Sequence, residues 1–203
     1  MTKIAVIGNP GAWSTEHLAD AVEERTGSRI IVDLARISLD LDQGRVVFED
    51  VNLLEVDGVV VKKIGRQYSP RHLDRLEVLR YVQDRGVPVF SNPARIQRVI
   101  DRLCCTVTLR SAEVPMPPTV VTEHIAAAVA AVDRFGRAVF KPLFSTKARG
   151  MEVIEAGEGA EAKIRAYQQD GHRVMYIQKM MDLPGQDYGI AFPSANEGVQ
   201  VAL

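Results

Sequence analysis

The segment from Val139 to Val153 constrains this chain more than any other part of its sequence. An apolar, strand-like run ends at Lys141, a loop of small and basic residues follows, and the chain then returns to apolar strand character. A lysine at the end of a buried strand places a compact cation beside a loop whose backbone N–H groups also bind anions. The segment therefore predicts a β-hairpin whose loop covers a phosphate group.

A second apolar run, from Val174 to Met181, follows this hairpin after a helix predicted over residues 161–169. The order is a strand with a lysine, a Gly-containing loop, a return strand, a helix and then an apolar strand. This order resembles the ATP-grasp superfamily, and most of all its RimK-like and glutathione-synthetase-like branch. The resemblance covers residues 88–192 by motif, and the front of the chain by general layout.

The resemblance implies that the chain binds ATP with Mg²⁺. Lys141 would contact the phosphates, residues 144–150 would fold over them, and residues 178–181 would lie beside the adenine. Lys147 and Arg149 are open to two interpretations, a clamp on the γ-phosphate or exposed charges on a hairpin. The nucleotide-binding residues implied in this way are Arg102, Lys141, Ser145, Thr146, Lys147, Gly150, Gln178, Lys179, Met180, Met181 and Asp187.

Three positions depart from the family pattern. Arg102 stands where relatives often carry lysine, which keeps the charge and changes its reach. Lys179 stands where an acidic residue is common, and Gly189 where an arginine is usual. The family's magnesium ligands lie on later strands, and this chain stops at Leu203, so the resemblance assigns no metal ligand and no catalytic residue here. We therefore expect either a longer natural protein or a truncated member that does not turn over ATP by itself.

The function implied by the resemblance is an ATP-dependent ligase that joins a carboxylate to an amine or thiol through an acylphosphate. The sequence does not identify these substrates, and the resemblance implies a homo-oligomer. The three departures leave a second hypothesis, a non-catalytic nucleotide-binding or scaffold protein derived from the same fold. A third hypothesis is a small-molecule-binding α/β domain in which Lys141 is structural. Nucleotide binding and ATP turnover would separate the three.

Composition argues against several other classes. The 25 Lys and Arg residues nearly balance the 26 Asp and Glu residues, so there is no basic field for nucleic acid or a membrane surface. No apolar run approaches the ~20 residues that cross a bilayer, and no GxxxxGK[ST] phosphate loop is present. The two cysteines, Cys104 and Cys105, are adjacent and indicate a reduced, cytoplasmic setting.

The front of the chain alternates strands and helices, which predicts a mostly parallel α/β sheet. Core strands are expected over residues 3–8, 29–34, 58–61 and 87–90, with an added hairpin strand over 45–49. One helix should begin at a cap formed by Ser14 or Thr15 and end near Arg25, and another should begin at Pro70 and end at Gly86. The fold predicted is a Rossmann-like domain over residues 1–92 followed by an ATP-grasp α+β unit, C-terminally incomplete. That unit, residues 93–203, comprises the central subdomain and the start of the C-terminal subdomain.

Some features of the sequence allow more than one interpretation. The turn Gly8-Asn9-Pro10-Gly11 lacks the GxGxxG spacing of a dinucleotide site, so we expect a plain strand-to-helix turn. Trp13 and His17 either line a substrate cleft or are a packed aromatic and a surface histidine. On the arginine-rich helical stretch after Pro93, we expect a solvated face for Arg95 and Arg98 and a phosphate contact for Arg102. In the second half, Thr122 should cap a helix ending near Arg134, with strands over 137–142, 152–155 and 173–179.

Overall fold

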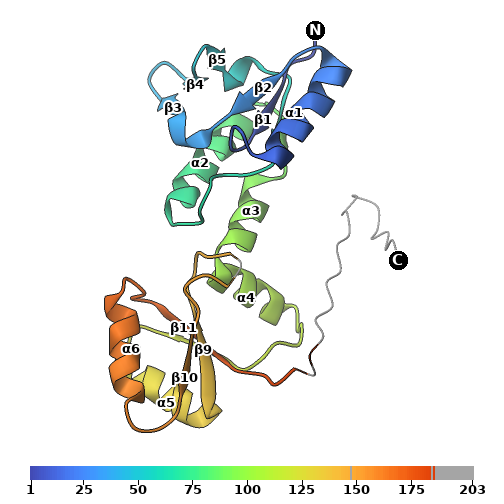
Figure 1. Cartoon of the computed structure of the whole chain (residues 1–203). Coiled ribbons are helices and arrows are strands. Elements are labelled where there is room, and N and C mark those ends of the chain that lie inside the picture. The colour runs from blue at the N-terminus through green and yellow to red at the C-terminus, as the bar shows by residue number, and fades with distance from the viewer. Residues whose placement is uncertain (147, 184, 186–203) are drawn as a thin grey trace.

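The computed structural model describes residues 1–146, 148–183 and 185. Figure 1 shows two sheet-containing parts connected by a helical segment. The first sheet contains β1 (Ile4–Ile7), β2 (Ile30–Val32), β6 (Gly58–Val61) and β7 (Val89–Phe90), in the order β2-β1-β6-β7. All three pairings are parallel, as the alternation of strands and helices predicted.

The first sheet is buried because its strands are apolar and helices pack against them. Helices α1 (Trp13–Thr26) and α2 (Arg71–Asp84) connect its strands. On α2, Leu76, Leu79 and Val82 are buried, at the three-residue spacing that places side chains on one face of a helix. A small antiparallel sheet of β3 (Ser38–Asp40), β4 (Arg45–Phe48) and β5 (Val51–Asn52), with 3₁₀ turns Leu34–Arg36 and Leu53–Glu55, adds Val46, Phe48 and Leu53 to the same core.

Two consecutive helices, α3 (Pro93–Ile100) and α4 (Arg102–Ser111), lead to the second sheet. The Asn92 side chain accepts hydrogen bonds from the first N–H groups of α3, and that of Asp101 does the same for α4. The arginine-rich stretch is thus broken at Asp101, and Arg102 is the first residue of the second helix.

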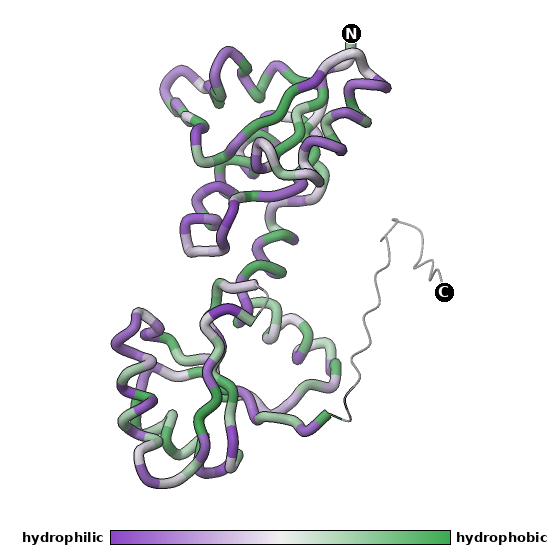
Figure 2. The backbone as a smooth tube through the Cα atoms, in the orientation of Figure 1, coloured by the Kyte–Doolittle hydropathy of each residue, from purple (hydrophilic) through white to green (hydrophobic). Residues whose placement is uncertain are grey.

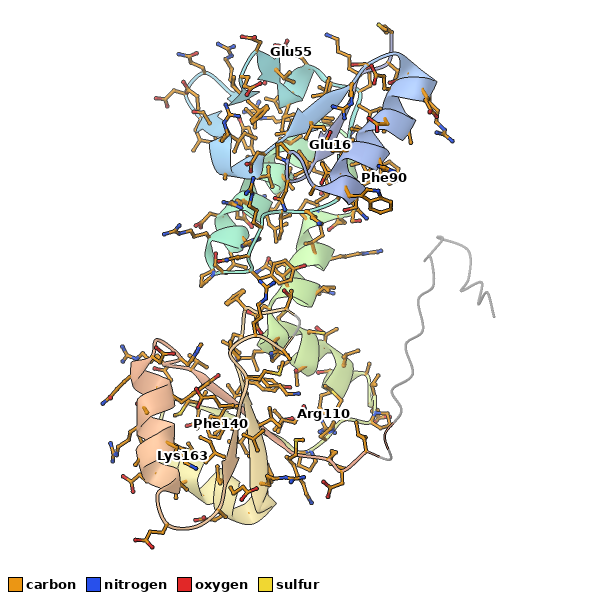
Figure 3. The ribbon with its side chains drawn as sticks, in the orientation of Figure 1. Glu16, Glu55, Phe90, Arg110, Phe140 and Lys163 are labelled. Carbon is orange, nitrogen blue, oxygen red and sulfur yellow. The ribbon has the colours of Figure 1, made fainter. Side chains whose placement is uncertain are left out.

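The second sheet is antiparallel and follows the order β10-β9-β11-β8. Its strands are β8 (Thr119–Thr122), β9 (Arg137–Lys141), β10 (Glu152–Glu155) and β11 (Met175–Lys179). Helices α5 (Ile125–Phe135) and α6 (Ala160–Gln169) pack on this sheet. Phe140, labelled in Figure 3, is fully buried, and its ring centroid lies 5.2 Å from that of Tyr167 on α6. Figure 2 shows hydrophobic residues following the strands of both sheets.

Two predicted helix caps were wrong. Helix α1 begins at Trp13 after the N-cap residue Ala12, so both expected caps, Ser14 and Thr15, lie inside the helix. Thr15 is fully buried, where its Oγ1 accepts a hydrogen bond from the Asn9 N–H. A Cβ at Gly8 would overlap Thr15, so the glycine permits this close approach of strand and helix. Thr122 does not cap α5, because pairing of Thr122 with Met175 extends β8 through that residue. Helix α5 begins three positions later, at Ile125, and His124 is its N-cap residue.

The glycines predicted to end helices do so. Gly27 follows α1 in the left-handed region with φ 72°, and Gly136 follows α5 with φ 74°. No helix in the described ranges is both long enough and apolar enough to span a membrane. The division of the chain into domains at residue 92 stays a prediction.

Candidate functional site

A cavity of about 270 Å³ lies where the start of α4 meets the ends of β9 and β11. We call it the lysine cavity, because Lys141 lies on its wall at the last position of β9. Four residues named from the sequence line it together, although they come from four different segments. These residues are Arg102, Lys141, Ser145 and Gln178, and the other lining residues are Tyr68, Val99, Ile100, Cys105, Thr106, Met116, Leu143 and Tyr176.

Lys141 is half-buried and is held toward the centre of the sheet. Its Nζ donates a hydrogen bond of 2.6 Å to Oε1 of Gln178 on the neighbouring strand β11. Burial lowers the pKa of Lys141, and the positive charge of Arg102 lowers it further. An ammonium group in this position gains from any anion that enters the cavity.

Arg102 connects the start of α4 to the chain that follows β9. Its Nε donates to the Pro142 carbonyl oxygen at 2.8 Å, and its Nη2 donates to Ser145 Oγ at 3.0 Å. The backbone N–H of Arg102 also donates to the Leu143 carbonyl oxygen at 3.0 Å. The guanidinium carbon lies 5.9 Å from the ring centroid of Tyr176. These contacts fix the second cation of the cavity in place.

The polar groups around Gln178 form a connected network. Its Nε2 donates to Thr119 Oγ1 on β8 at 3.0 Å and lies 3.4 Å from the Tyr176 hydroxyl. That hydroxyl lies 2.8 Å from Oγ1 of Thr106 on α4. The amide of Gln178 therefore has partners on both its oxygen and its nitrogen, which orients Lys141 before any ligand arrives.

The charge of the lysine cavity is positive and is not neutralised by its walls. Lys141 and Arg102 are its two charged lining residues, and no aspartate or glutamate is among the described residues that line it. Neither cation forms an ion pair within the described ranges. Two fixed cations in a partly desolvated cavity favour a phosphate or another anion.

The loop after β9 borders a second cavity of about 300 Å³. Thr146 and Gly150, both named from the sequence, line it together with Ser145, and Gly150 has φ 67°. Ser145 and Tyr68 line both this loop cavity and the lysine cavity. The described part of the loop therefore adjoins the cations, as a cover over phosphates would require.

Of the residues predicted to lie beside adenine, 178–181, the last three lie outside the lysine cavity. Lys179 ends β11 and is exposed, and its backbone N–H donates to the Pro118 carbonyl oxygen at 2.9 Å. Met180 and Met181 are 36% and 45% exposed. None of the three lines the lysine cavity, so an adenine contact would lie outside it.

Two of the named residues, Lys147 and Asp187, lie outside the described residues. Trp13 and His17 form an exposed pair with ring centroids 4.4 Å apart, and they line neither the lysine cavity nor the loop cavity. The role of all the named residues in binding a nucleotide stays a prediction.

Sequence reasoning missed three cavity residues, Tyr176, Thr106 and Tyr68. Tyr176 could have been found, since it lies two positions before Gln178 and therefore on the same face of β11. The other two approach from α4 and from the loop before α2, which no local pattern in the sequence predicts.

The residues that could bind phosphate are cationic, and a magnesium ion would need oxygen ligands instead. Within the described ranges, no group of three or more His, Cys, Asp or Glu side chains is arranged to hold a metal ion. The described residues thus fit the phosphate part of an ATP–magnesium complex and supply no metal centre of their own.

Comparison with proteins of known sequence finds glutamate ligases. The chain is 27% identical to tetrahydromethanopterin:alpha-L-glutamate ligase of Methanosarcina acetivorans and 25% identical to that of Methanococcus maripaludis. Each match covers 92% of this chain, and the chain spans 63% of the length of each ligase. No protein-family model matches the chain.

Comparison with solved structures finds the same fold. A RimK-domain ATP-grasp protein from Sphaerobacter thermophilus superposes with a TM-score of 0.69 at 19% identity, covering 90% of this chain and 65% of that one. D-alanyl-alanine synthetase A from Vibrio cholerae gives a TM-score of 0.66 at 13% identity, covering 98% of this chain and 73% of that one. The fold is therefore that of the ATP-grasp proteins. The sequence relatives are glutamate ligases, and one of the structures with this fold is a RimK-domain protein, so the chain is similar to RimK-like ATP-grasp proteins in both comparisons.

Proposed function

We propose that this chain belongs to an ATP-dependent ligase that joins a carboxylate to an amine. The observation that carries the proposal is the lysine cavity, in which Lys141 and Arg102 face a space without a neutralising carboxylate among the described residues. The names of the sequence relatives support an amino acid as the amine, and L-glutamate is the first to test. A thiol remains the alternative nucleophile.

The chemistry has two steps. A carboxylate is a poor electrophile, so one of its oxygens first attacks the γ-phosphorus of ATP, and ADP leaves. The amine nitrogen then attacks the carbonyl carbon of the acylphosphate, the C–O bond to phosphate breaks, and the nitrogen loses a proton as the amide forms. Magnesium bound with ATP would neutralise further phosphate charge, and within the described ranges no group of three or more His, Cys, Asp or Glu side chains is arranged to hold that ion.

The residues of this chain would act by positioning and by charge. Lys141, oriented by Gln178, would bind phosphate oxygens and offset the negative charge that gathers during transfer. Arg102 would bind a phosphate from the opposite segment while it holds the loop through Ser145. No nucleophilic side chain is required, because the protein would bring two substrates and a nucleotide together.

The test has two measurements. Calorimetry of this chain with a non-hydrolysable ATP analogue and Mg²⁺ should show binding. An assay with L-glutamate and candidate carboxylates should show ADP release from a protein extended to the length of the related ligases, because the chain of 203 residues is expected not to turn over ATP by itself. Absence of nucleotide binding would overturn the proposal. Binding without ADP release in any mixture would favour a nucleotide-binding scaffold instead.

A further inference from the structure

A third cavity, of about 720 Å³, lies at the carboxyl ends of the strands of the first sheet. We call it the arginine cavity. Asn9 follows β1, Asp33 follows β2, and the stretch from Gly65 to Arg75 follows β6 and enters α2. The chain passes from β1 to β2 on one side and later to β6 on the other side. In open parallel sheets, ligands bind in the crevice outside the strand ends at such a reversal.

The charge of the arginine cavity is strongly positive. Arg66, Arg71 and Arg75 line it against a single acidic side chain, Asp33. Asp33 already accepts a hydrogen bond from the Ala35 N–H at 2.9 Å. In the described part of the chain, none of the three arginines forms an ion pair. The N-terminus of the fourteen-residue helix α2 opens on the same cavity and adds a positive partial charge.

A buried histidine in the cavity wall lacks a partner for one nitrogen. His72 is 1% exposed, its Nε2 is buried, and this atom has no hydrogen-bond partner within the described ranges. Its Nδ1 lies 3.2 Å from the Ser69 backbone nitrogen and 3.1 Å from the Ser69 carbonyl oxygen, so that side of the ring is satisfied. A buried polar atom without a partner is uncommon in folded proteins and can be satisfied by a bound water, ion or ligand.

Gly65 allows the side chains of Arg75 and His72 to approach the same point of the backbone. A Cβ at this position would overlap Nη1 of Arg75 and would lie 2.8 Å from Nε2 of His72. Both side chains thus approach the backbone at Gly65, and Arg75 donates to the Ile64 carbonyl oxygen at 2.7 Å. The wall of the arginine cavity is therefore built around a glycine, with a guanidinium and an imidazole on one side.

Tyr68 connects the arginine cavity to the proposed ligase site. It lines the arginine, lysine and loop cavities, and its ring packs edge-on against His72 with centroids 5.5 Å apart. A molecule that extends past Tyr68 from the arginine cavity would reach the phosphate-binding cations.

We propose that the arginine cavity binds a second anionic group, a carboxylate or a phosphate, of the acceptor molecule whose own carboxylate is activated beside Lys141. The acceptor is then a multiply charged acid rather than a simple monocarboxylic acid. This inference rests on the proposed ligase function, whereas anion binding in the cavity can be measured without a nucleotide.

The test is a titration followed by nuclear magnetic resonance, with glutarate and inorganic phosphate as separate probes. At least one probe should shift the ring signals of His72 and the backbone signals of Gly65. Binding of glutarate alone identifies a carboxylate, and binding of phosphate alone identifies a phosphate. If neither probe moves these signals, the inference is overturned.

Matched variants distinguish a site from general charge attraction. Arg71→Gln and Arg75→Gln should each weaken binding of the active probe at least tenfold. Arg80→Gln removes the same charge from the same helix, but Arg80 pairs with Glu77 and Asp84, so this variant should bind normally. Equal weakening by Arg80→Gln would overturn the inference. Arg71 is exposed, so Arg71→Gln keeps the test valid if Arg75→Gln unfolds.

Lys141→Ala separates this inference from the proposed function. It should weaken binding of the ATP analogue by roughly 5- to 150-fold and leave binding of the anionic probe at His72 unchanged. A protein that binds the probe at His72 but no nucleotide would contradict the proposed function alone. A protein that binds the nucleotide but neither probe would contradict only the arginine cavity.

Discussion

The lysine cavity and the arginine cavity are both cationic, but they differ in how far the protein itself satisfies their polar groups. In the lysine cavity, Lys141, Gln178 and Arg102 all have hydrogen-bond partners within the protein. In the arginine cavity, Nε2 of His72 lacks one. The first cavity is thus preorganised, which suits the phosphate group proposed to bind there. The second retains an unsatisfied nitrogen in its wall.

The two cavities are built on different hydrophobic cores, the lysine cavity on that of the second sheet and the arginine cavity on that of the first. The largest effect that we expect is on stability, from a change in the core of the second sheet. Phe140→Ala removes a fully buried ring from the second sheet and should destabilise the protein by about 3–5 kcal/mol. Denaturant unfolding should show this loss, and nucleotide binding should fall with it. Val153→Ala on β10, where Val153 is 50% exposed, is the control and should change stability by less than about 0.5 kcal/mol. A small effect of Phe140→Ala would contradict the packing described for this sheet.

The next effect concerns the lysine cavity alone. Lys141→Ala should weaken binding of an ATP analogue by about 1–3 kcal/mol, since one charge-assisted phosphate contact is lost. Calorimetry at equal ionic strength measures it. Lys163→Ala, on the exposed side of α6, removes the same charge and should bind like the wild type. Equal affinities of the two variants would remove Lys141 from the nucleotide site.

The third effect concerns the arginine cavity. Gly65→Ala should destabilise the protein by about 1–3 kcal/mol, because the added methyl group overlaps Arg75 and approaches His72. Probe binding at His72 should be lost, while ATP-analogue binding remains. Gly58→Ala is the comparison, because its Cβ would meet the flexible end of Ile4 at 3.2 Å. If Gly65→Ala changes neither stability nor probe binding, Arg75 and His72 do not pack closely against Gly65.

The smallest effect is a dependence of stability on pH. Burial lowers the pKa of His72 below its ordinary value of 6.5, and the charge of Arg75 contributes. The unfolded chain therefore binds a proton that the folded chain does not. Stability should fall as the pH drops below about 6.5, by at most ~1.4 kcal/mol per pH unit from this group. His72→Phe should flatten this part of the stability curve measured by thermal unfolding, and a curve as steep as that of the wild type would exclude His72 as its cause.

The sequence predicted those parts of the fold that depend on local patterns. Residues 58–61 and 152–155 are strands at the predicted bounds, and Gly27 and Gly136 end helices as expected. These elements follow from apolar runs and from the conformational freedom of glycine. The predicted caps Thr15 and Thr122 failed, since burial against Asn9 and pairing with Met175 outweigh capping preference.

The site could be predicted only where a family pattern supplied long-range information. The lysine cavity brings together Arg102, Lys141, Ser145 and Gln178. These residues are spread over the chain, since 76 positions (178 − 102) separate Arg102 from Gln178. The arginine cavity was not predicted at all. Its residues 65–75 form a loop and a helix start of mixed polarity, and only the parallel pairing of β1 with β6 brings them beside Asn9.

The hydrogen bonds of Arg102 have a thermodynamic consequence. Its side chain holds Pro142 and Ser145, so a phosphate that competes for the guanidinium weakens its hold on the segment after β9. Linkage makes this relation reciprocal: whatever tightens that segment onto Arg102 must lower phosphate affinity by the same factor. Ser145→Ala removes one of the competing acceptors. If phosphate binds to Arg102 as proposed, its affinity depends partly on a serine that carries no charge.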